Sequence, residues 1–355
     1  MIIYFATVVV TILLQLLRAA VSKSDSKSRR VTSVQHGLDL ACVLVLAAAP
    51  GFRAWNIGTD TWMYTAMYDM TIDSDSWSNT QEQAIVEPGY ALWEFTWKTL
   101  GLSTQWFLVV TALAINGLQY VAIRMISPRM LPAISAYVLS GLYLFQFNGM
   151  RQALAIAIFV LGAALILRGR RAGWAVLLLA ASVHHSTLIV LPAFILARRY
   201  QRRTTFKMST VMLCGGAVVL LLAISTSLAE FLTDLVGDKY GSYLGQDTGS
   251  GRGRLAHLAV MLMVTWFLQS TDLPERLHCL TRFYSLGLGA QMVGLQLAVL
   301  DRVTLYFTAS LPMFIAVMLT CGSRTRHAVL WLGIVAYFYA NLTHYGDLLP
   351  YEWSL

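Results

Sequence analysis

An arginine between two apolar segments is the residue whose position points most clearly to a functional site. Arg151 lies in the stretch 147–152, between the apolar segments 131–147 and 153–167, each about long enough to cross a bilayer. A charge buried without a partner at such a place is costly, so Arg151 predicts an anion or a carboxylate nearby. A side chain that reaches from a loop back to water is the competing interpretation.

A second arginine, Arg302, occupies a similar position at the start of another apolar segment. Backbone N–H groups at the start of a helix add partial positive charge. A guanidinium donates paired hydrogen bonds to phosphate oxygens and stays protonated. Arg151, with Gln152 beside it, and Arg302 together therefore suit a pyrophosphate. Asp301 allows a different interpretation of Arg302, namely a local ion pair.

Two acidic residues stand in turns that could face the same ligand. Asp60 lies in Gly-Thr-Asp-Thr-Trp-Met-Tyr at 58–64, and Tyr64 and Tyr68 follow it on one face of the expected helix. Glu87 begins Glu-Pro-Gly-Tyr at 87–90. Each acid has a structural alternative, because Asp60 could simply cap a helix and Glu87 could simply begin a turn.

Two adjacent histidines, His184 and His185, interrupt the apolar run 172–197. Histidine exchanges a proton near neutral pH, and an ionisable residue at a break in a membrane segment predicts a function. The alternative is a polar side chain that only bonds a neighbouring helix.

The elements that must position these residues are membrane helices. Of 355 residues 57% are hydrophobic and 12% are charged. The net charge of +8 comes from Arg and Lys gathered in short loops, as the positive-inside rule predicts, and so does not indicate nucleic-acid binding. The four cysteines form no CxxC or Cys/His pattern, which argues against a disulfide framework or a zinc site. We predict an all-α, polytopic membrane protein with a single transmembrane domain, 1–355.

The apolar segments and their flanking charges predict about ten spans. The basic stretch 18–36 follows the first segment and places its end in the cytoplasm, which argues against a cleaved signal peptide. The acidic interval 53–103, with helices at the membrane interface, and the loop 230–254 are predicted to be extracytoplasmic. The predicted spans are 1–17, 38–52, 104–123, 131–147, 153–167, 208–229, 255–271, 283–300, 303–320 and 328–344.

The run 172–197 departs from this alternation, because basic residues flank both of its ends. A broken, re-entrant pair of helices, 172–183 and 188–197 with the histidines at the turn, satisfies both ends. Twelve helical residues rise about 18 Å, past the midplane of a hydrocarbon core about 30 Å thick. Non-helical backbone at that depth must line protein or a water-filled cavity. One ordinary span followed by a misplaced basic loop is the alternative.

This topology places the candidate residues on one side of the membrane. Asp60, Glu87, Arg151 and Arg302 are all predicted to be extracytoplasmic, and the histidine turn reaches toward them from below. Four separate loops agree on this side, which is stronger support than any one of them.

The order of these motifs resembles that of a known family. GTDTWMY (58–64), EPGY (87–90), MRQALAIA (150–157), His185-Ser186, RVTLYF (302–307) and Pro350-Tyr351 follow one another as in the EpsG family of Wzy-like polysaccharide polymerases. The resemblance runs from about residue 50 to the end of the chain and rests on order and spacing, not on any single motif. The family usually has one histidine. His185 matches it by its place before Ser186, and His184 is the second candidate.

The resemblance implies glycan polymerisation at the outer face of the bacterial cytoplasmic membrane. An undecaprenyl-pyrophosphate-linked chain would be transferred to a hydroxyl of an incoming lipid-linked repeat unit, with no cofactor. A divalent ion on Asp60 and Glu87 is allowed but not required. The implied partners are lipid-linked oligosaccharides, membrane lipid, and a chain-length regulator and flippase of the same pathway, and no nucleic acid.

On this hypothesis the candidate residues divide into three groups. Arg151 and Arg302 hold the pyrophosphate, which needs fixed positive charge. Asp60, Glu87 or His185 positions or deprotonates the acceptor hydroxyl, and the sequence does not choose among them. The remaining residues bind substrate or line its path: Tyr64, Tyr68, Gln152, His184 and Tyr306.

Three other functions compete with the polymerase, and one of them is a structural assembly protein with no catalysis. A transporter or flippase for lipid-linked oligosaccharides could use arginines in a cavity, although such proteins typically show two related halves, and none is visible in the sequence. A membrane acyltransferase that modifies glycans would use a histidine as base, and would place it near the cytoplasmic side, where its acyl donor is found.

Overall fold

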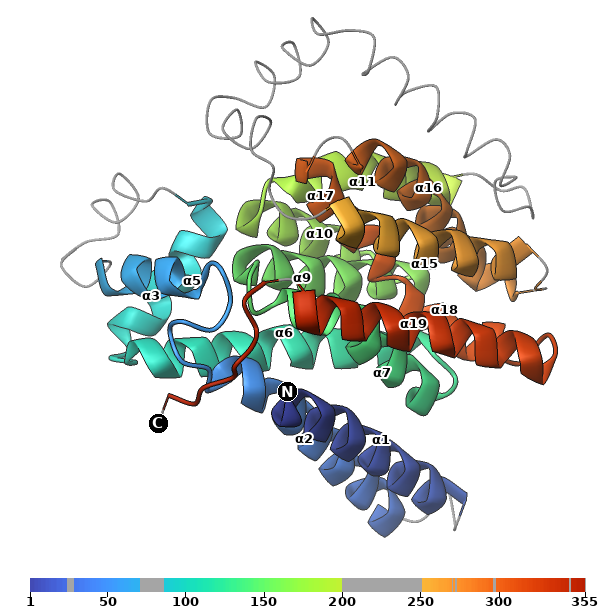
Figure 1. Cartoon of the computed structure of the whole chain (residues 1–355), viewed down its shortest axis with the longest axis horizontal. Coiled ribbons are helices and arrows are strands. Elements are labelled where there is room, and N and C mark those ends of the chain that lie inside the picture. The colour runs from blue at the N-terminus through green and yellow to red at the C-terminus, as the bar shows by residue number, and fades with distance from the viewer. Residues whose placement is uncertain are drawn as a thin grey trace, which may run out of the picture.

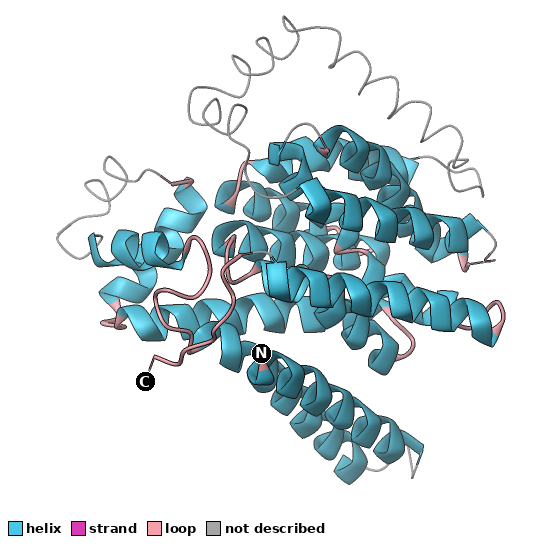
Figure 2. Cartoon of the chain, in the orientation of Figure 1, coloured by secondary structure: helices cyan, strands magenta, loops and turns pink. Residues whose placement is uncertain are grey.

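The computed structural model describes residues 1–23, 29–70, 86–199, 251–269, 271, 273–295, 298–344 and 346–354. Within these ranges the chain is helical and contains no strand (Figure 2). A single antiparallel bridge joins Arg53 to Trp353. The prediction of an all-α protein is confirmed for the described part of the chain.

The helices follow the apolar segments of the sequence. In chain order the longer ones are α1 (Ile2–Lys23), α2 (Arg29–Gly51), α3 (Thr61–Met70), α5 (Pro88–Thr99), α6 (Thr104–Ile126), α7 (Met130–Leu139), α9 (Met150–Leu167), α10 (Ala172–Val183), α11 (Ser186–Arg199), α15 (Gly251–Gln269), α16 (His278–Gly294), α17 (Ala298–Thr308), α18 (Leu311–Met318) and α19 (Arg324–His344). Short pieces are α8 (Leu142–Phe145) and the 3₁₀ turn η2 (Glu275–Leu277). Figure 1 shows α6 and α9 running side by side through the body, from which the α1–α2 hairpin protrudes.

Four of the described helices are long and apolar enough to cross a membrane. They lie in α1, α2, α6 and α9, and α17 with α18 adds a fifth if the pair, bent by 47°, counts as one span. The prediction of a multi-pass membrane protein therefore holds, but about ten spans are not confirmed. The predicted span 208–229 and nearly all of the predicted loop 230–254 lie outside the described residues, as does 71–85 of the interval 53–103.

Several predicted boundaries were wrong. The predicted spans 283–300 and 303–320 do not meet at 301–302, because α16 ends at Gly294, α17 covers Ala298–Thr308, and the 47° bend before α18 falls inside 303–320. The segment 131–147 is not one helix, because it breaks between α7 and α8 at Gly141, whose φ of +85° suits glycine. A Cβ at Gly141 would lie 3.0 Å from the Tyr337 ring, so α19 packs directly on this turn. The predicted loop 230–254 ends early, because α15 begins at Gly251.

The break at the two histidines is confirmed, and the two halves fold back on each other. α10 ends at Val183 and α11 begins at Ser186. Nη1 of Arg198, near the end of α11, donates to the carbonyl oxygen of Ile166 at 3.3 Å. α10 begins beside the same end of α9, where a Cβ on Gly173 would lie only 2.5 Å from the oxygen of Gly162. Both outer ends of the pair therefore meet at one end of α9, as a re-entrant hairpin requires and a single crossing span does not.

The basic ends of two long helices meet on one carboxylate. Asp39 of α2 accepts from Nε of Arg18 in α1 at 2.5 Å and lies 2.6 Å from Nη1 of Arg124 in α6. The hydroxyl of Tyr120 also donates to Asp39. A buried carboxylate needs such partners, and here they join α1, α2 and α6 at one end. This agrees with the predicted topology, in which the span 1–17 ends in the cytoplasm and the span 104–123 starts from the extracytoplasmic interval 53–103 and therefore also ends in the cytoplasm.

Gly58 shapes the loop that leads into α3. Its φ is +86°, and a Cβ there would lie 2.5 Å from the Phe147 oxygen and 2.6 Å from Oδ1 of Asn148. We expect Gly58→Ala to lower the free energy of unfolding by about 1–3 kcal/mol, because the backbone strain and the steric overlap act together.

The matched control is Gly37→Ala in α2, where nothing lies within 4 Å of the added Cβ. Alanine there should be neutral or stabilising by about 0.5–1 kcal/mol, because it favours the helix. Thermal unfolding in detergent measures both changes. Equal melting temperatures for the two variants would contradict the tight approach of this loop to the α8–α9 turn.

Candidate functional site

A cavity of about 450 Å³ opens between helices that are far apart in the sequence. It is bounded by the loop before α3, the turn between α8 and α9, the starts of α15 and α17, and the end of α19. The lining includes side chains with carboxylate, guanidinium, amide or imidazole groups: Asp60, Asn148, Arg254, His257, Asp301, Arg302 and Asn341. Two guanidinium groups and two carboxylates thus share one open cavity, as binding of an anion next to a hydroxyl-rich ligand would require.

Arg302 reaches the cavity from the first turns of α17, and its side chain is exposed. Its backbone is fixed to α9, because Nε2 of Gln152 donates to the carbonyl oxygen of Arg302 at 2.9 Å. Gln152 therefore connects the start of α9, where Arg151 lies, to the start of α17. The two predicted arginine sites are neighbours in the fold.

Arg151 is paired with Glu87. Nη1 of Arg151 lies 3.2 Å from Oε2 of Glu87, and the guanidinium carbon is 5.8 Å from the Tyr64 ring centre and 5.9 Å from the Tyr90 ring centre. The backbone N–H of His185 donates to Oε1 of Glu87 at 3.4 Å. Both carboxylate oxygens are therefore occupied, and the Glu87 side chain is only 7% exposed.

The charge of Glu87 is maintained by its surroundings. Burial acts to raise the pKa of the Glu87 carboxyl, but His184, Arg151 and backbone hydrogen bonds together bring this pKa below its usual value. Burial raises the pKa of Tyr64, and the charges of Arg151 and Arg302 both act against that rise. Both guanidinium groups are thus close enough to act on the same ring, between the ion pair and the cavity.

The turn of the re-entrant hairpin carries a chain of hydrogen bonds. Nδ1 of His184 accepts from the backbone N–H of Ser186 at 3.2 Å and lies 2.8 Å from its hydroxyl. The hydroxyl of Tyr306 is 3.1 Å from that of Ser186 and 2.9 Å from that of Thr187. Because Nδ1 accepts from a backbone N–H, neutral His184 carries its proton on Nε2.

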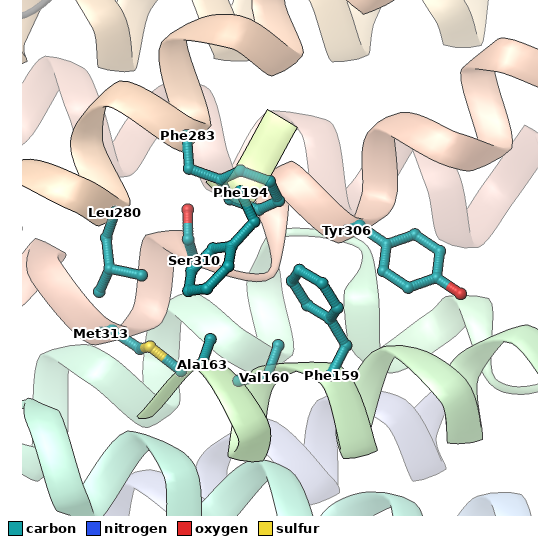
Figure 3. A pocket seen from close by; sticks show the side chains of 9 residues that line it. All are labelled: Phe159, Val160, Ala163, Phe194, Leu280, Phe283, Tyr306, Ser310 and Met313. Atoms are coloured by element: carbon teal, nitrogen blue, oxygen red, sulfur yellow. The ribbon is translucent and has the colours of Figure 1, made fainter. Parts of the chain in front are cut away.

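Tyr306 faces two environments. Its ring lies against a small apolar pocket whose lining includes Phe159, Phe194 and Phe283, and its hydroxyl points away from that pocket (Figure 3). The T-shaped contact with Phe159, at 5.5 Å between ring centres, fixes the ring. Tyr306 therefore anchors the histidine turn to α17, and its hydroxyl is used within that turn.

The structure brings most of the predicted residues together. Asp60 and Arg302 line the cavity, and Gln152 connects Arg302 to α9. A second group, which does not line the cavity, surrounds the ion pair and the histidine turn: Glu87, Arg151, Tyr64, His184 and Tyr306. Two predicted side chains lie elsewhere. The imidazole of His185 is exposed, and only its backbone N–H joins the group. Tyr68 stacks on Phe107 at 4.1 Å and donates to the Leu102 oxygen at 2.9 Å.

Sequence reasoning missed several lining residues. Arg254 and His257 lie on one face at the start of α15, three residues apart. That spacing was in the sequence, but the expected helix began at 255, so Arg254 was assigned to a loop. Asn148 holds the Gly-Thr-Asp turn, because its Oδ1 accepts from the Thr59 N–H at 2.9 Å. Among the described residues no three His, Cys, Asp or Glu side chains gather as a metal site would need.

Glu94, one turn below Tyr90 on α5, is buried beside this site. Its side chain is 3% exposed, and its Oε1 has no hydrogen-bond partner among the described residues. Burial raises the pKa of Glu94 to about 8, against the opposing charge of Arg151. α5 is not among the helices long and apolar enough to cross a membrane.

We expect Glu94 to make stability depend on pH. The folded protein keeps a proton that the unfolded chain releases near pH 4.5, so this residue's contribution falls as the pH rises from about 4.5 to about 8 and is constant above that. Glu94→Gln should flatten the decline of melting temperature in this window. Glu275→Gln, at an exposed site, is the control and should leave the decline unchanged. An identical pH profile for wild type and Glu94→Gln would contradict the buried, protonated carboxyl.

Comparison with known proteins places the chain in one family. The model of the EpsG family matches residues 38–353, which covers every residue of the cavity and of the ion pair. No curated protein and no solved structure matches the chain.

Proposed function

Because the chain belongs to the EpsG family, whose model covers residues 38–353, we propose that it lengthens a polysaccharide from lipid-linked units. The family indicates a multi-pass membrane protein of the polysaccharide-polymerase type. In the proposed reaction a glycan on undecaprenyl pyrophosphate is transferred to a hydroxyl of an incoming lipid-linked repeat unit. The reaction takes place at the outer face of the bacterial cytoplasmic membrane and releases undecaprenyl pyrophosphate.

The observation that carries this proposal is the cavity of about 450 Å³ that holds Arg254, Arg302, Asp60 and Asp301 together. A leaving pyrophosphate accumulates negative charge, and guanidinium groups fixed by the fold stabilise that charge without reorganising. Nη1 of Arg254 donates to the Leu295 oxygen at 3.1 Å, which orients the guanidinium and uses one of its five N–H donors. The remaining donors suit phosphate oxygens.

Arg151 has a different setting from Arg302. Its ion pair with Glu87 neutralises much of its charge and holds the histidine turn through the His185 N–H. Arg302 and Arg254 line the cavity and Arg151 does not, so we assign the pyrophosphate first to Arg302 and Arg254. Contact between Arg151 and the pyrophosphate stays a prediction, as does a direct role of the His185 imidazole.

The test is a reconstituted reaction. Purified protein in liposomes receives lipid-linked repeat units and no nucleotide sugar, and the products are separated by length. We expect a ladder of glycans that differ by whole repeat units, together with release of undecaprenyl pyrophosphate. Units that appear on the opposite leaflet without any gain in length would contradict the proposal and support a transporter.

A further inference from the structure

In the part of the chain that the structure describes, Asp60 and Asp301 are the carboxylates that line the cavity, whereas Glu87 and Glu94 lie nearby and do not. Glu87 has both oxygens occupied, and Glu94 is buried in α5. Oδ1 of Asp60 accepts from the hydroxyl of its neighbour Thr59 at 2.9 Å. Asp301 is held by residues of two other helices, so its position is fixed by the fold.

The contacts of Asp301 all involve one of its oxygens. Nε2 of Gln291, on α16, donates to Oδ1 of Asp301 at 2.7 Å, and Nδ1 of His257, on α15, lies 3.8 Å from the same oxygen. The amide of Gln291 is oriented in turn, because its Oε1 accepts from the hydroxyl of Thr304 at 2.5 Å. The carboxylate is 30% exposed, which leaves Oδ2 for a ligand in the cavity within the described part of the chain.

His257 is itself held on both sides. Its side chain is 4% exposed, its ring stacks on Tyr337 at 5.6 Å between ring centres, and its Nε2 lies 2.9 Å from the hydroxyl oxygen of Thr308. The hydroxyl of Thr308 is itself oriented, because it donates to the Thr304 carbonyl oxygen at 3.2 Å. On the other side of the ring, Nδ1 of His257 faces Oδ1 of Asp301.

We propose that Asp301 is the catalytic carboxylate that binds and deprotonates the acceptor hydroxyl, and that His257 is its positioning residue. This inference rests on the proposed function. Arg254 precedes His257 by three residues on α15 and Arg302 follows Asp301 directly on α17, so the helices that hold the carboxylate also supply the guanidinium groups. The acceptor hydroxyl and the leaving pyrophosphate must be neighbours at the moment of transfer, and this cavity provides both sites.

The acceptor oxygen forms a bond to the anomeric carbon of the donor sugar while its proton passes to Oδ2 of Asp301. The bond from that carbon to the pyrophosphate oxygen breaks, and its electron pair leaves with undecaprenyl pyrophosphate, beside Arg254 and Arg302. Asp301 then releases the proton to water, which restores the carboxylate.

The test compares Asp301→Asn with Asp60→Asn in the reconstituted reaction. Loss of the base is expected to lower kcat by about 10²–10⁴-fold, which is the usual contribution of a general base. Binding of undecaprenyl pyrophosphate, measured separately, should be unchanged or tighter in Asp301→Asn, because a negative charge next to the arginines has been removed. Glu275→Gln, at an exposed site, controls for handling of the variants.

Two outcomes overturn the inference while leaving the proposed function intact. One is an Asp301→Asn protein that lengthens glycans at the wild-type rate while Asp60→Asn does not. The other is a loss of kcat together with a loss of pyrophosphate binding, which indicates a collapsed cavity. A wild-type protein that lengthens no glycan refutes the proposed function itself. This outcome is distinguishable from failure of the inference, because it is seen with the wild type alone and needs no variant.

The positioning role of His257 has its own readout. His257→Asn keeps an amide donor near the place of Nδ1, whereas His257→Leu keeps only bulk. We expect the asparagine variant to retain about tenfold more of kcat than the leucine variant, which corresponds to one hydrogen bond to a charged group. Equal kcat values for the two variants would show that His257 only fills space.

Discussion

Replacing Arg302 with lysine is expected to lower the rate of glycan lengthening by about 10²–10³-fold, comparable to the loss of one fixed donor to a developing anion. Lysine keeps the positive charge but presents a single ammonium in place of a planar fork of donors. The side chain is exposed at the cavity, and its backbone is held by Gln152, so the substitution should change the ligand contact and leave the fold intact. The initial rate with purified variant and lipid-linked units measures the effect.

The matched control is Arg170→Lys. Arg170 is exposed in the turn between α9 and α10, at the end of α9 opposite to the Gln152–Arg302 contact. It should lengthen glycans like the wild type. If Arg302→Lys and Arg170→Lys have the same rate at equal protein levels, Arg302 does not hold the pyrophosphate.

Glu87→Gln is expected to have the largest effect on stability, lowering the free energy of unfolding by about 3 kcal/mol. The substitution leaves Arg151 near the two tyrosine rings without its counter-ion and weakens the contact to the His185 N–H. Because Glu87 connects α5, α9 and the histidine turn, lengthening activity should fall with stability. Thermal unfolding measures the loss, and Glu352→Gln, at an exposed site near the C-terminal end, is the control.

A double variant separates charge from shape at this pair. In the double variant Glu87→Gln/Arg151→Gln, no charge is left without a partner. The stability losses of the two single variants should therefore sum to more than the loss of the double variant. Recovery of about 1 kcal/mol or more is the expected coupling for residues in contact. Strictly additive losses would mean that the ion pair does not contribute as a pair.

The re-entrant hairpin was predictable because two signals in 172–197 disagreed. The length of the segment suits one membrane crossing, whereas the basic residues at both ends place both ends in the cytoplasm. Basic residues at both ends of 172–197 excluded a simple crossing, and the polar turn marked the break. The position of the break required no tertiary information. The charge rule also predicted that Asp60, Glu87, Arg151 and Arg302 lie on one side of the membrane. In the fold Asp60 and Arg302 line one cavity, whereas Glu87 and Arg151 form an ion pair that does not line it.

The choice between the two histidines was not predictable. His184 is extended, with φ −153° and ψ 122°, so successive side chains point in opposite directions. A shift of one residue therefore exchanges the histidine in the hydrogen-bond chain for the one that is exposed. Motif position favoured His185, whereas the fold places the imidazole of His184 against Ser186. Only the geometry of the turn decides this.

Arg53 shows a second limit of sequence reasoning. It reads as an ordinary basic loop residue after the second span, yet it is 1% exposed. Its Nε donates to the Thr61 hydroxyl at 2.9 Å, its Nη1 donates to the Pro50 oxygen, and its guanidinium lies 5.6 Å from the Phe147 ring centre. It joins the start of α3 to the turn before α9. Contacts of this kind depend on which loops meet, and no local pattern in the chain encodes that.

The most direct test of the central claim is a structure of the protein in a lipid bilayer with undecaprenyl pyrophosphate bound. We predict that the two phosphates lie in the cavity between Arg254 and Arg302, that the polyprenyl chain leaves toward the membrane, and that Asp301 faces the space for the acceptor. Phosphates bound at another place, or a cavity that opens to the cytoplasmic face, would contradict it.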